Sequence, residues 1–269
     1  MKKFLSIALA TASIAACLSF VGCNGGEATV NYTLSEDGTY YIVSSVTGNK
    51  NALTSYQIPA TYSEQEDGEQ LPVTVIGENA FYQCRKLRSV IIPDSVTEIG
   101  TRSFAMSGIT QIEIPDSVET IGYMAFAMCN YLDEVVIPES VTYLGDAAFY
   151  ECQELQRAEV YANITVLKGG TFYNKVKVVG GNAYYHQLTQ IVLPASLEKI
   201  ASSALEGNPL TDIYFTGSEE QWDNLYFYTF QEKENNKPNA EPEYEEVKVE
   251  KKYCIPSTTT IHFNYVQGN

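Results

Sequence analysis

The sequence predicts an α/β fold of the solenoid type, in which short coils of similar sequence stack through a parallel β-ladder. One phrase occurs three times between residues 87 and 149, as LRSVIIPDSVTEIGTRSF, ITQIEIPDSVETIGYMAF and LDEVVIPESVTYLGDAAF. The prolines of the three copies lie 22 and 23 residues apart, and each copy has a phenylalanine 11 residues after its proline. A period of this length is typical of solenoids, whose repeats contact only their neighbours.

Each coil contains a triplet of apolar residues that predicts one strand with an inward face. The triplets are Leu87, Val90 and Ile92; Ile109, Ile112 and Ile114; Leu132, Val135 and Ile137; Leu155, Ala158 and Val160; Leu188, Ile191 and Leu193; and Leu210, Ile213 and Phe215. The last two members of each triplet are separated by one residue, which is the alternation of a strand. Because every coil contributes its strand in the same direction, we expect the strands to pair in parallel.

Two further positions recur in each coil. A second inward row begins with Val96 and Ile99 and ends at a glycine, Gly100 in that coil, which we expect to adopt a positive φ at a bend. Phenylalanine follows four residues later and is expected to fill the interior. One coil alone cannot bury this apolar surface, so stacking must stabilise it, at about 1.5–3 kcal/mol for each fully buried apolar side chain.

This pattern resembles the BspA-like leucine-rich repeat family of bacterial surface lipoproteins, over about residues 58–217. The segments Tyr214–Trp222 and Thr260–Tyr265 are similar to the closing segment of that family. The resemblance implies a right-handed leucine-rich-repeat solenoid, export from the cell, and a role in adhesion or protein interaction rather than catalysis. The fourth and fifth repeats depart from the family pattern, with Val160-Tyr161 in place of Ile-Pro and Lys168 in place of glycine.

The N-terminal segment, residues 1–22, is predicted to be a lipoprotein signal peptide. Two lysines precede an apolar run that is short for a membrane span, and Phe20-Val21-Gly22-Cys23 resembles a lipoprotein processing site. An acyl chain on Cys23 would anchor the exported protein to a membrane, with residues 23–29 as a tether. Cys17 is the alternative lipidation site, although cleavage there would leave an apolar stretch exposed.

Two segments flank the repeats. Residues 30–57 predict an N-terminal β-hairpin cap, because an Asp-Gly turn joins two strand-forming runs. Residues 218–269 predict a C-terminal cap, in which a capping box of Ser218 and Gln221 begins a short helix and a strand follows. Trp222 of this helix is expected to seal the core, and residues 231–252 have the composition of a mobile acidic insertion.

The return arc between Tyr173 and Gln187 carries an insertion that has two interpretations. We favour a loop that folds back over the convex side of the solenoid. The alternative is a small projecting hairpin, in which exposed Tyr184 and Tyr185 would be good contact residues for a partner.

The sequence indicates neither a metal site nor a catalytic site. Cys84, Cys129 and Cys152 share one repeat position, three residues after a phenylalanine, and are interpreted as small buried apolar residues. A disulfide between Cys129 and Cys152 is the alternative. The chain has two histidines, no C-x-x-C pair, no nucleophile motif and no phosphate-binding loop, so we expect no metal, no cofactor and no enzymatic activity.

The outward positions of the main strands form the candidate partner-binding surface. One column reads Ile91, Glu113, Val136, Glu159, Val192 and Tyr214, and the column beside it includes Gln111, Glu134 and Arg157. We expect these side chains to be exposed, although β-branched residues also stabilise any sheet face. The chain has 33 acidic and 17 basic residues and a net charge of −16, which disfavours nucleic acid and anionic lipid as partners.

These observations predict a monomeric, lipid-anchored recognition or adhesion module of the cell envelope. Its partner would be a protein or a glycan at the cell surface. An envelope spacer protein without a specific ligand is the alternative hypothesis.

Overall fold

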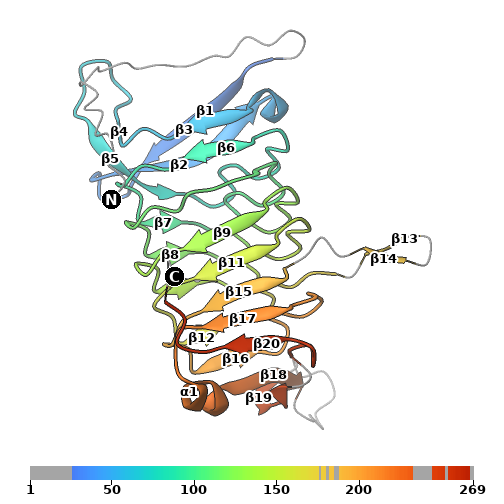
Figure 1. The fold of residues 1–269 in the computed structure, drawn as a ribbon. Helices are drawn as coiled ribbons and strands as arrows, with labels where there is room; N and C mark the ends of the chain where they lie inside the picture. The colour runs from blue at the N-terminus through green and yellow to red at the C-terminus, as the bar shows by residue number, and fades with distance from the viewer. Residues whose placement is uncertain are drawn as a thin grey trace, which may run out of the picture.

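The computed structural model describes residues 26–175, 177–179, 182–184, 188–232, 244–251 and 254–266. These residues form an elongated stack of coils, with the hairpin β1–β2 at one end and the helix α1 at the other (Figure 1). Most strands pair in parallel with the equivalent strand of the next coil, so the predicted solenoid is confirmed. The α/β class overstates the helix content, because in the described residues the arcs between strands are turns and α1 (Glu219–Asn224) is the single α-helix.

Strands line the stack on two sides. The main sheet contains β9 (Glu134–Ile137), β11 (Arg157–Val160), β15 (Gln190–Leu193), β17 (Asp212–Phe215) and β20 (Thr260–His262), all parallel. At the N-terminal end, β3 (Ser55–Gln57) and β6 (Ser89–Ile91) form a separate parallel pair.

The second ladder contains the parallel strands β2 (Tyr41–Gly48), β5 (Leu71–Ile76), β7 (Glu98–Ile99), β8 (Thr120–Ile121) and β10 (Tyr143–Leu144). Two strands join it in antiparallel pairs, β1 (Ala28–Leu34) with β2 and β4 (Thr61–Tyr62) with β5. A 3-10 turn over Lys50–Ala52 follows β2. The later coils form another sheet of β12 (Val166–Leu167), β16 (Lys199–Ala201), β18 (Tyr226–Glu232) and β19 (Tyr244–Lys248).

The main ladder is interrupted in the second repeat, where residues 111–114 form no strand. The arc that leads into this segment, from Phe104 to Pro115, is one residue shorter than the arcs before and after it. Ile112 is consequently half-buried, whereas Val90 and Val135 at the same position of the neighbouring coils are buried. The other predicted inward positions of the triplets are all buried.

Phenylalanine forms the central column of the core. The rings of Phe81, Phe104, Phe126, Phe149 and Phe172 are buried and nearly parallel, with neighbouring centroids 5.1–5.4 Å apart and interplanar angles of 3–8°. This spacing is close to the distance between paired strands, about 4.8 Å. Each ring therefore lies in register with its own coil, as the repeat predicts.

The repeat glycines have a different role from the one that the sequence suggested. Gly77, Gly100, Gly122 and Gly145 do not have positive φ values, so that expectation was wrong. A Cβ on Gly122 would lie 2.7 Å from the Thr101 nitrogen and 2.8 Å from the Gly100 carbonyl carbon, which is too close for any side chain. Positive φ occurs instead two residues before and after the phenylalanines, at non-glycine residues that include Arg102, Met106, Met124 and Met128.

The glycine column has the same extent as the second ladder. That ladder runs from β2 to β10, and β10 does not pair with β12 of the following coil. In that coil Lys168 replaces the glycine. The Lys168 ammonium lies 3.7 Å from the centre of the Tyr143 ring, so the replacement adds a cation–π contact.

The repeat cysteines are free, buried thiols, and the Cys129–Cys152 disulfide is not formed. The Cys129 Sγ donates to the carbonyl oxygen of Phe104 and the Cys152 Sγ to that of Phe126, each over 3.2 Å. Burial raises the pKa of the Cys129 thiol to about 12. Asn208, three residues after Leu205, donates in the same way to the carbonyl oxygen of Phe172, over 2.6 Å.

The helix α1 lies at the C-terminal end of the stack. Ser218 accepts from the Gln221 N–H and the Gln221 side chain accepts from the Ser218 N–H, which is the predicted capping box. Trp222 is buried, and its ring lies 5.4 Å from the Phe215 ring and 6.3 Å from the Phe227 ring. Trp222 therefore packs against the core at this end of the stack.

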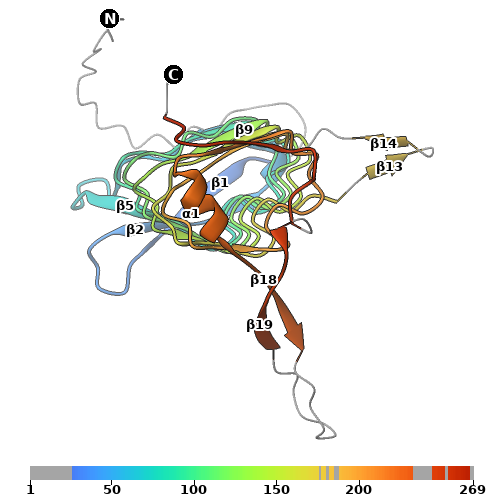
Figure 2. The same cartoon turned by 60° about the horizontal axis from the view of Figure 1, so that its bottom comes forward.

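Two hairpins project from the solenoid (Figure 2). The first is formed by β13 (Lys177–Val179) and β14 (Asn182–Tyr184), so the favoured prediction of a loop folded over the convex side was wrong. The second is formed by β18 and β19. The prediction of a mobile insertion over 231–252 lies partly outside the described residues and stays a prediction. Phe227 and Tyr228 of β18 are buried, and Lys199 forms an ion pair with Glu246 of β19, 2.8 Å apart.

The contact at Gly122 makes a stability prediction. Gly122→Ala should lower the free energy of unfolding by about 2–3 kcal/mol, because the new methyl group would displace a backbone layer. Gly169→Ala is the matched control, since its Cβ would meet only side-chain atoms, the first at 3.3 Å. It should change the free energy by less than about 1 kcal/mol in urea titrations. Equal losses in the two variants would contradict the close-packing role.

The thiol arrangement makes a second prediction. Cys84, Cys129 and Cys152 should not react with a thiol reagent in the native protein and should all react after unfolding in denaturant without reductant. The physical reason is that each side chain is fully buried and its pKa is raised by burial. Mass spectrometry of the labelled peptides would measure this, and an unlabelled Cys129–Cys152 pair after unfolding would show the disulfide instead.

Candidate partner-binding surface

The register of the main sheet brings the predicted outward residues into two columns. Glu134, Arg157, Gln190 and Asp212 are direct neighbours on β9, β11, β15 and β17. Val136, Glu159, Val192 and Tyr214 form the column beside them on the same strands. The columns that the repeat predicted are therefore present over these four coils.

The same side of the stack is open in its N-terminal part, which comprises β6, residues 111–114 and β9, the first strand of the main sheet. The side chains of Ile91 and Val136 are 60% and 44% exposed, and Gln111, Glu113 and Glu134 are exposed as well. We call these five residues the open strip. In the described part of the chain, neither Glu113 nor Glu134 forms an ion pair, so the strip combines unpaired carboxylates with exposed aliphatic side chains.

One edge of the open strip is formed by two residues that the sequence reasoning did not identify. Arg88 immediately precedes β6, and its guanidinium donates to the Gly108 carbonyl oxygen over 2.7 Å. The same group lies 4.5 Å from the centre of the exposed Tyr131 ring, one coil further along. Arg88 thus spans the second repeat at the point where the arc is one residue short, which no local sequence motif indicates.

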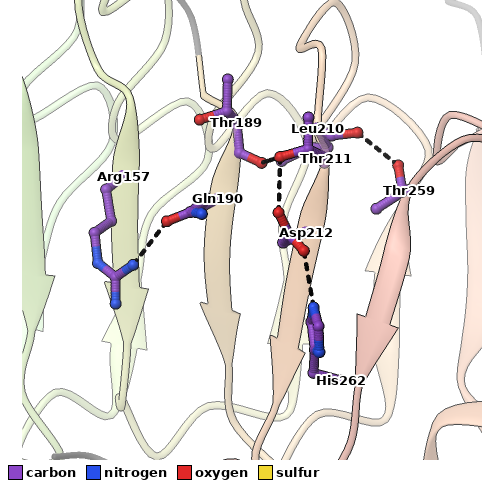
Figure 3. A network of polar contacts seen from close by, with 8 residues as sticks. All are labelled: Arg157, Thr189, Gln190, Leu210, Thr211, Asp212, Thr259 and His262. Carbon is purple, nitrogen blue, oxygen red and sulfur yellow. Dashed lines mark hydrogen bonds and ion pairs between the residues drawn. The ribbon is translucent and has the colours of Figure 1, made fainter.

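The later part of the face is occupied by the protein's own polar contacts (Figure 3). Arg157 is paired with Glu159, Nε to Oε1 2.7 Å, and donates to the Gln190 side chain over 2.9 Å. Tyr161 donates its hydroxyl hydrogen to the other Glu159 oxygen over 2.8 Å. The hydrogen bond to Glu159 raises the pKa of the Arg157 guanidinium further above its usual range. Arg157 and Glu159 were predicted partner contacts, and both have partners within the chain.

The C-terminal segment covers the same part of the face. His262 of β20 donates through Nε2 to Asp212 over 2.8 Å, and this bond lowers the pKa of the Asp212 carboxyl. The imidazole also stacks on Tyr214, with centroids 4.5 Å apart. Thr259 donates to the Leu210 carbonyl oxygen over 2.8 Å and attaches the start of the segment (Figure 3).

Tyr265 completes this cover. Its ring lies 4.9 Å from the Tyr214 ring, and its backbone N–H donates to the Phe215 carbonyl oxygen over 3.2 Å, so Tyr265 is held against β17. Val192 lies on β15 between Glu159 and Tyr214 of the neighbouring strands and is only 1% exposed, so the prediction of an exposed contact residue there was wrong.

Three other predicted site residues do not belong to the outward columns of the main sheet. Tyr184 belongs to β14 of the projecting hairpin, away from the main sheet. Tyr185 and the predicted lipidation residue Cys23 lie outside the described residues. The structure therefore does not bring Tyr184 together with the sheet columns.

Within the ranges that the structure describes, no group of three or more His, Cys, Asp or Glu side chains is arranged to hold a metal ion. None of the helices in these ranges has the length and apolar character that a membrane crossing requires.

The sequence matches the family described as the BspA type leucine rich repeat region, in six copies, over residues 69–179 and 174–237. Among solved structures, the chain is similar to the T. pallidum leucine rich repeat protein TpLRR, with 28% identity, coverage of 68% of this chain and 78% of that chain, and a TM-score of 0.56. A leucine-rich repeat protein from Bacteroides ovatus ATCC 8483 is 24% identical, over 68% of this chain and 53% of that chain, with a TM-score of 0.47.

A third similar structure is a leucine-rich repeat protein from Bacteroides capillosus ATCC 29799, which is 28% identical over 53% of this chain and 98% of that chain, with a TM-score of 0.42. No curated protein sequence gives a significant match. The leucine-rich repeat is a protein-interaction fold and not an enzyme family. Since the family match extends over more than half of its length, the chain belongs to the BspA type leucine-rich repeat family.

Proposed function

We propose that the protein is a recognition or adhesion module of the cell surface, and that it binds a protein or a glycan through the open strip. The observation that supports this is the division of the main sheet face. Its later part is covered by the C-terminal segment, whereas Ile91 and Val136 remain 60% and 44% exposed. Exposed aliphatic side chains beside carboxylates are typical of a contact surface with a polar rim.

The proposal includes anchoring of the exported protein to a membrane by an acyl chain on Cys23, with Cys17 as the alternative site. The tether would hold the solenoid above the membrane as a monomer. In this arrangement the hairpin β1–β2 and the helix α1 act as caps, because each covers one end of the stack and would protect strand edges from pairing with other chains. The right-handed coil of the family is part of the same proposal.

An envelope spacer without a ligand is the second candidate function. The exposed Ile91 and Val136 argue against it, since a spacer needs no apolar strip on one side of its sheet. Exposed apolar side chains also stabilise a sheet through cross-strand contacts. Binding experiments therefore distinguish the two functions.

Binding through the strip is tested with the pair Ile91→Asp and Val136→Asp. These changes should reduce the retention of surface proteins or glycans on the immobilised protein by at least about tenfold, because they remove the apolar contact area. Phe230→Asp is the matched control, since Phe230 is 63% exposed on the hairpin β18–β19. Equal retention by the wild-type protein and both variants would support the spacer function.

Lipidation is tested by expression in a bacterium that processes lipoproteins. The wild-type protein and Cys17→Ser should enter the detergent phase in a detergent–water partition, whereas Cys23→Ser should stay in the aqueous phase, because the acyl chain alone supplies the membrane affinity. A detergent-phase Cys23→Ser protein together with an aqueous Cys17→Ser protein would assign the lipid to Cys17. If all three proteins stay in the aqueous phase, the anchor is absent.

A further inference from the structure

The carboxylates around the open strip lack the partners that carboxylates have elsewhere on the same sheet. On the covered part, Glu159 pairs with Arg157 and Asp212 with His262. On the open part, exposed acidic residues also follow directly after the repeat prolines, at the carboxyl end of each apolar triplet. In the described part of the chain, no ion pair is formed by any of the acidic residues Asp94, Glu113, Asp116, Glu134 and Glu139.

The basic residues near this group are engaged elsewhere or lie at the other end of the strands. Arg157 is the register neighbour of Glu134, but it pairs with Glu159 and donates to Gln190. Arg85, Lys86 and Arg88 precede β6, at the amino end of the strand, whereas the prolines and their acidic neighbours lie at the opposite end. The Arg88 guanidinium is also held by the Gly108 carbonyl oxygen and the Tyr131 ring. The strip therefore presents net negative charge, in a chain whose overall charge is −16.

The C-terminal segment shows which groups a polypeptide places on this face. It lies on the same sheet, and it puts an imidazole N–H on the Asp212 carboxylate and the Tyr265 ring against the Tyr214 ring. The occupant of the covered part thus matches a carboxylate with a nitrogen donor and an aromatic position with an aromatic side chain. The open strip continues this face with carboxylates and with aliphatic side chains in place of Tyr214.

We propose that the open strip binds a basic polypeptide segment, in which lysine or arginine side chains are combined with apolar or aromatic ones. This inference rests on the proposed function and names the partner class for the same surface. Cationic side chains would pair with Glu113 and Glu134, and apolar side chains would cover Ile91 and Val136. Anionic glycans are disfavoured by charge, and a neutral glycan would leave the carboxylates without opposite charge.

The test measures binding of labelled octapeptides by fluorescence anisotropy, with the complete mature protein at neutral pH. The probes are four Arg-Tyr repeats, four Ser-Tyr repeats and four Glu-Tyr repeats. We expect the Arg-Tyr peptide to bind most tightly, and we expect its affinity to fall as the salt concentration is raised, since exposed charge pairs are screened. Binding of all three peptides with equal affinity would overturn the inference.

The decisive comparison uses two variants with the same change in net charge. Glu113→Gln with Glu134→Gln should weaken binding of the Arg-Tyr peptide by roughly tenfold, because each exposed ion pair contributes up to about a fivefold change in affinity. Glu36→Gln with Glu66→Gln removes two exposed carboxylates outside the main sheet and should leave the affinity within about twofold. Equal weakening by both pairs would mean diffuse attraction to an acidic protein and would overturn the inference.

A neutral oligosaccharide separates failure of this inference from failure of the proposed function. If a hexamer of N-acetylglucosamine binds and Ile91→Asp with Val136→Asp abolishes its binding, while the Arg-Tyr peptide does not bind, the strip recognises a glycan. The proposed function then holds and the basic partner is wrong. If neither probe binds and the strip variants also retain surface material as the wild-type protein does, both proposals fail.

Discussion

Every coil of this protein must have the same thickness, because successive backbones are in contact at the glycine column and successive phenylalanine rings are stacked in parallel. The ring centroids repeat at 5.1–5.4 Å, and a Cβ on Gly145 would lie 2.5 Å from the Gly122 carbonyl carbon. Neither contact tolerates a thicker layer. This explains why the tract from proline to phenylalanine keeps a constant length of 11 residues in the three clearest repeats. The main ladder is interrupted at residues 111–114, which follow a phenylalanine-to-proline arc that is one residue short, and the second ladder ends before the coil of Lys168.

Side chains that point outward are free of this constraint, and the coils differ from one another at these positions. The insertion after Tyr173 forms a hairpin that leaves the stack without disturbing it, because both of its ends belong to the same arc. The outward columns of the main sheet change from aliphatic and acidic residues to an internally paired network within a few coils. A repeat of similar apolar inward residues thus supports a face whose chemistry differs along its length.

Much of the fold could be predicted because its determinants are local and repeated. The phenylalanine column, the inward triplets and the capping box at Ser218 each depend on residues within one coil. The role of the repeat glycines could not be assigned, since glycine permits both a positive φ and a close backbone contact, and only the neighbouring coil decides between them. Burial of Val192 was also beyond the sequence, because its register neighbours Glu159 and Tyr214 belong to other coils.

The return of the C-terminal segment sets the length of the open strip. Strand β20 is added to the main sheet beside β17, and Tyr265 after it packs against Tyr214. On the preceding strands Arg157 pairs with Glu159 and donates to Gln190. The face is therefore occupied by internal contacts from its C-terminal end as far as Arg157, and it is open from β9 toward β6. Since the closing segment is attached through Asp212 and Tyr214, it covers a fixed number of coils from the end. Repeats added before β11 would lengthen the open strip without altering this cover, whereas repeats lost there would remove the strip first.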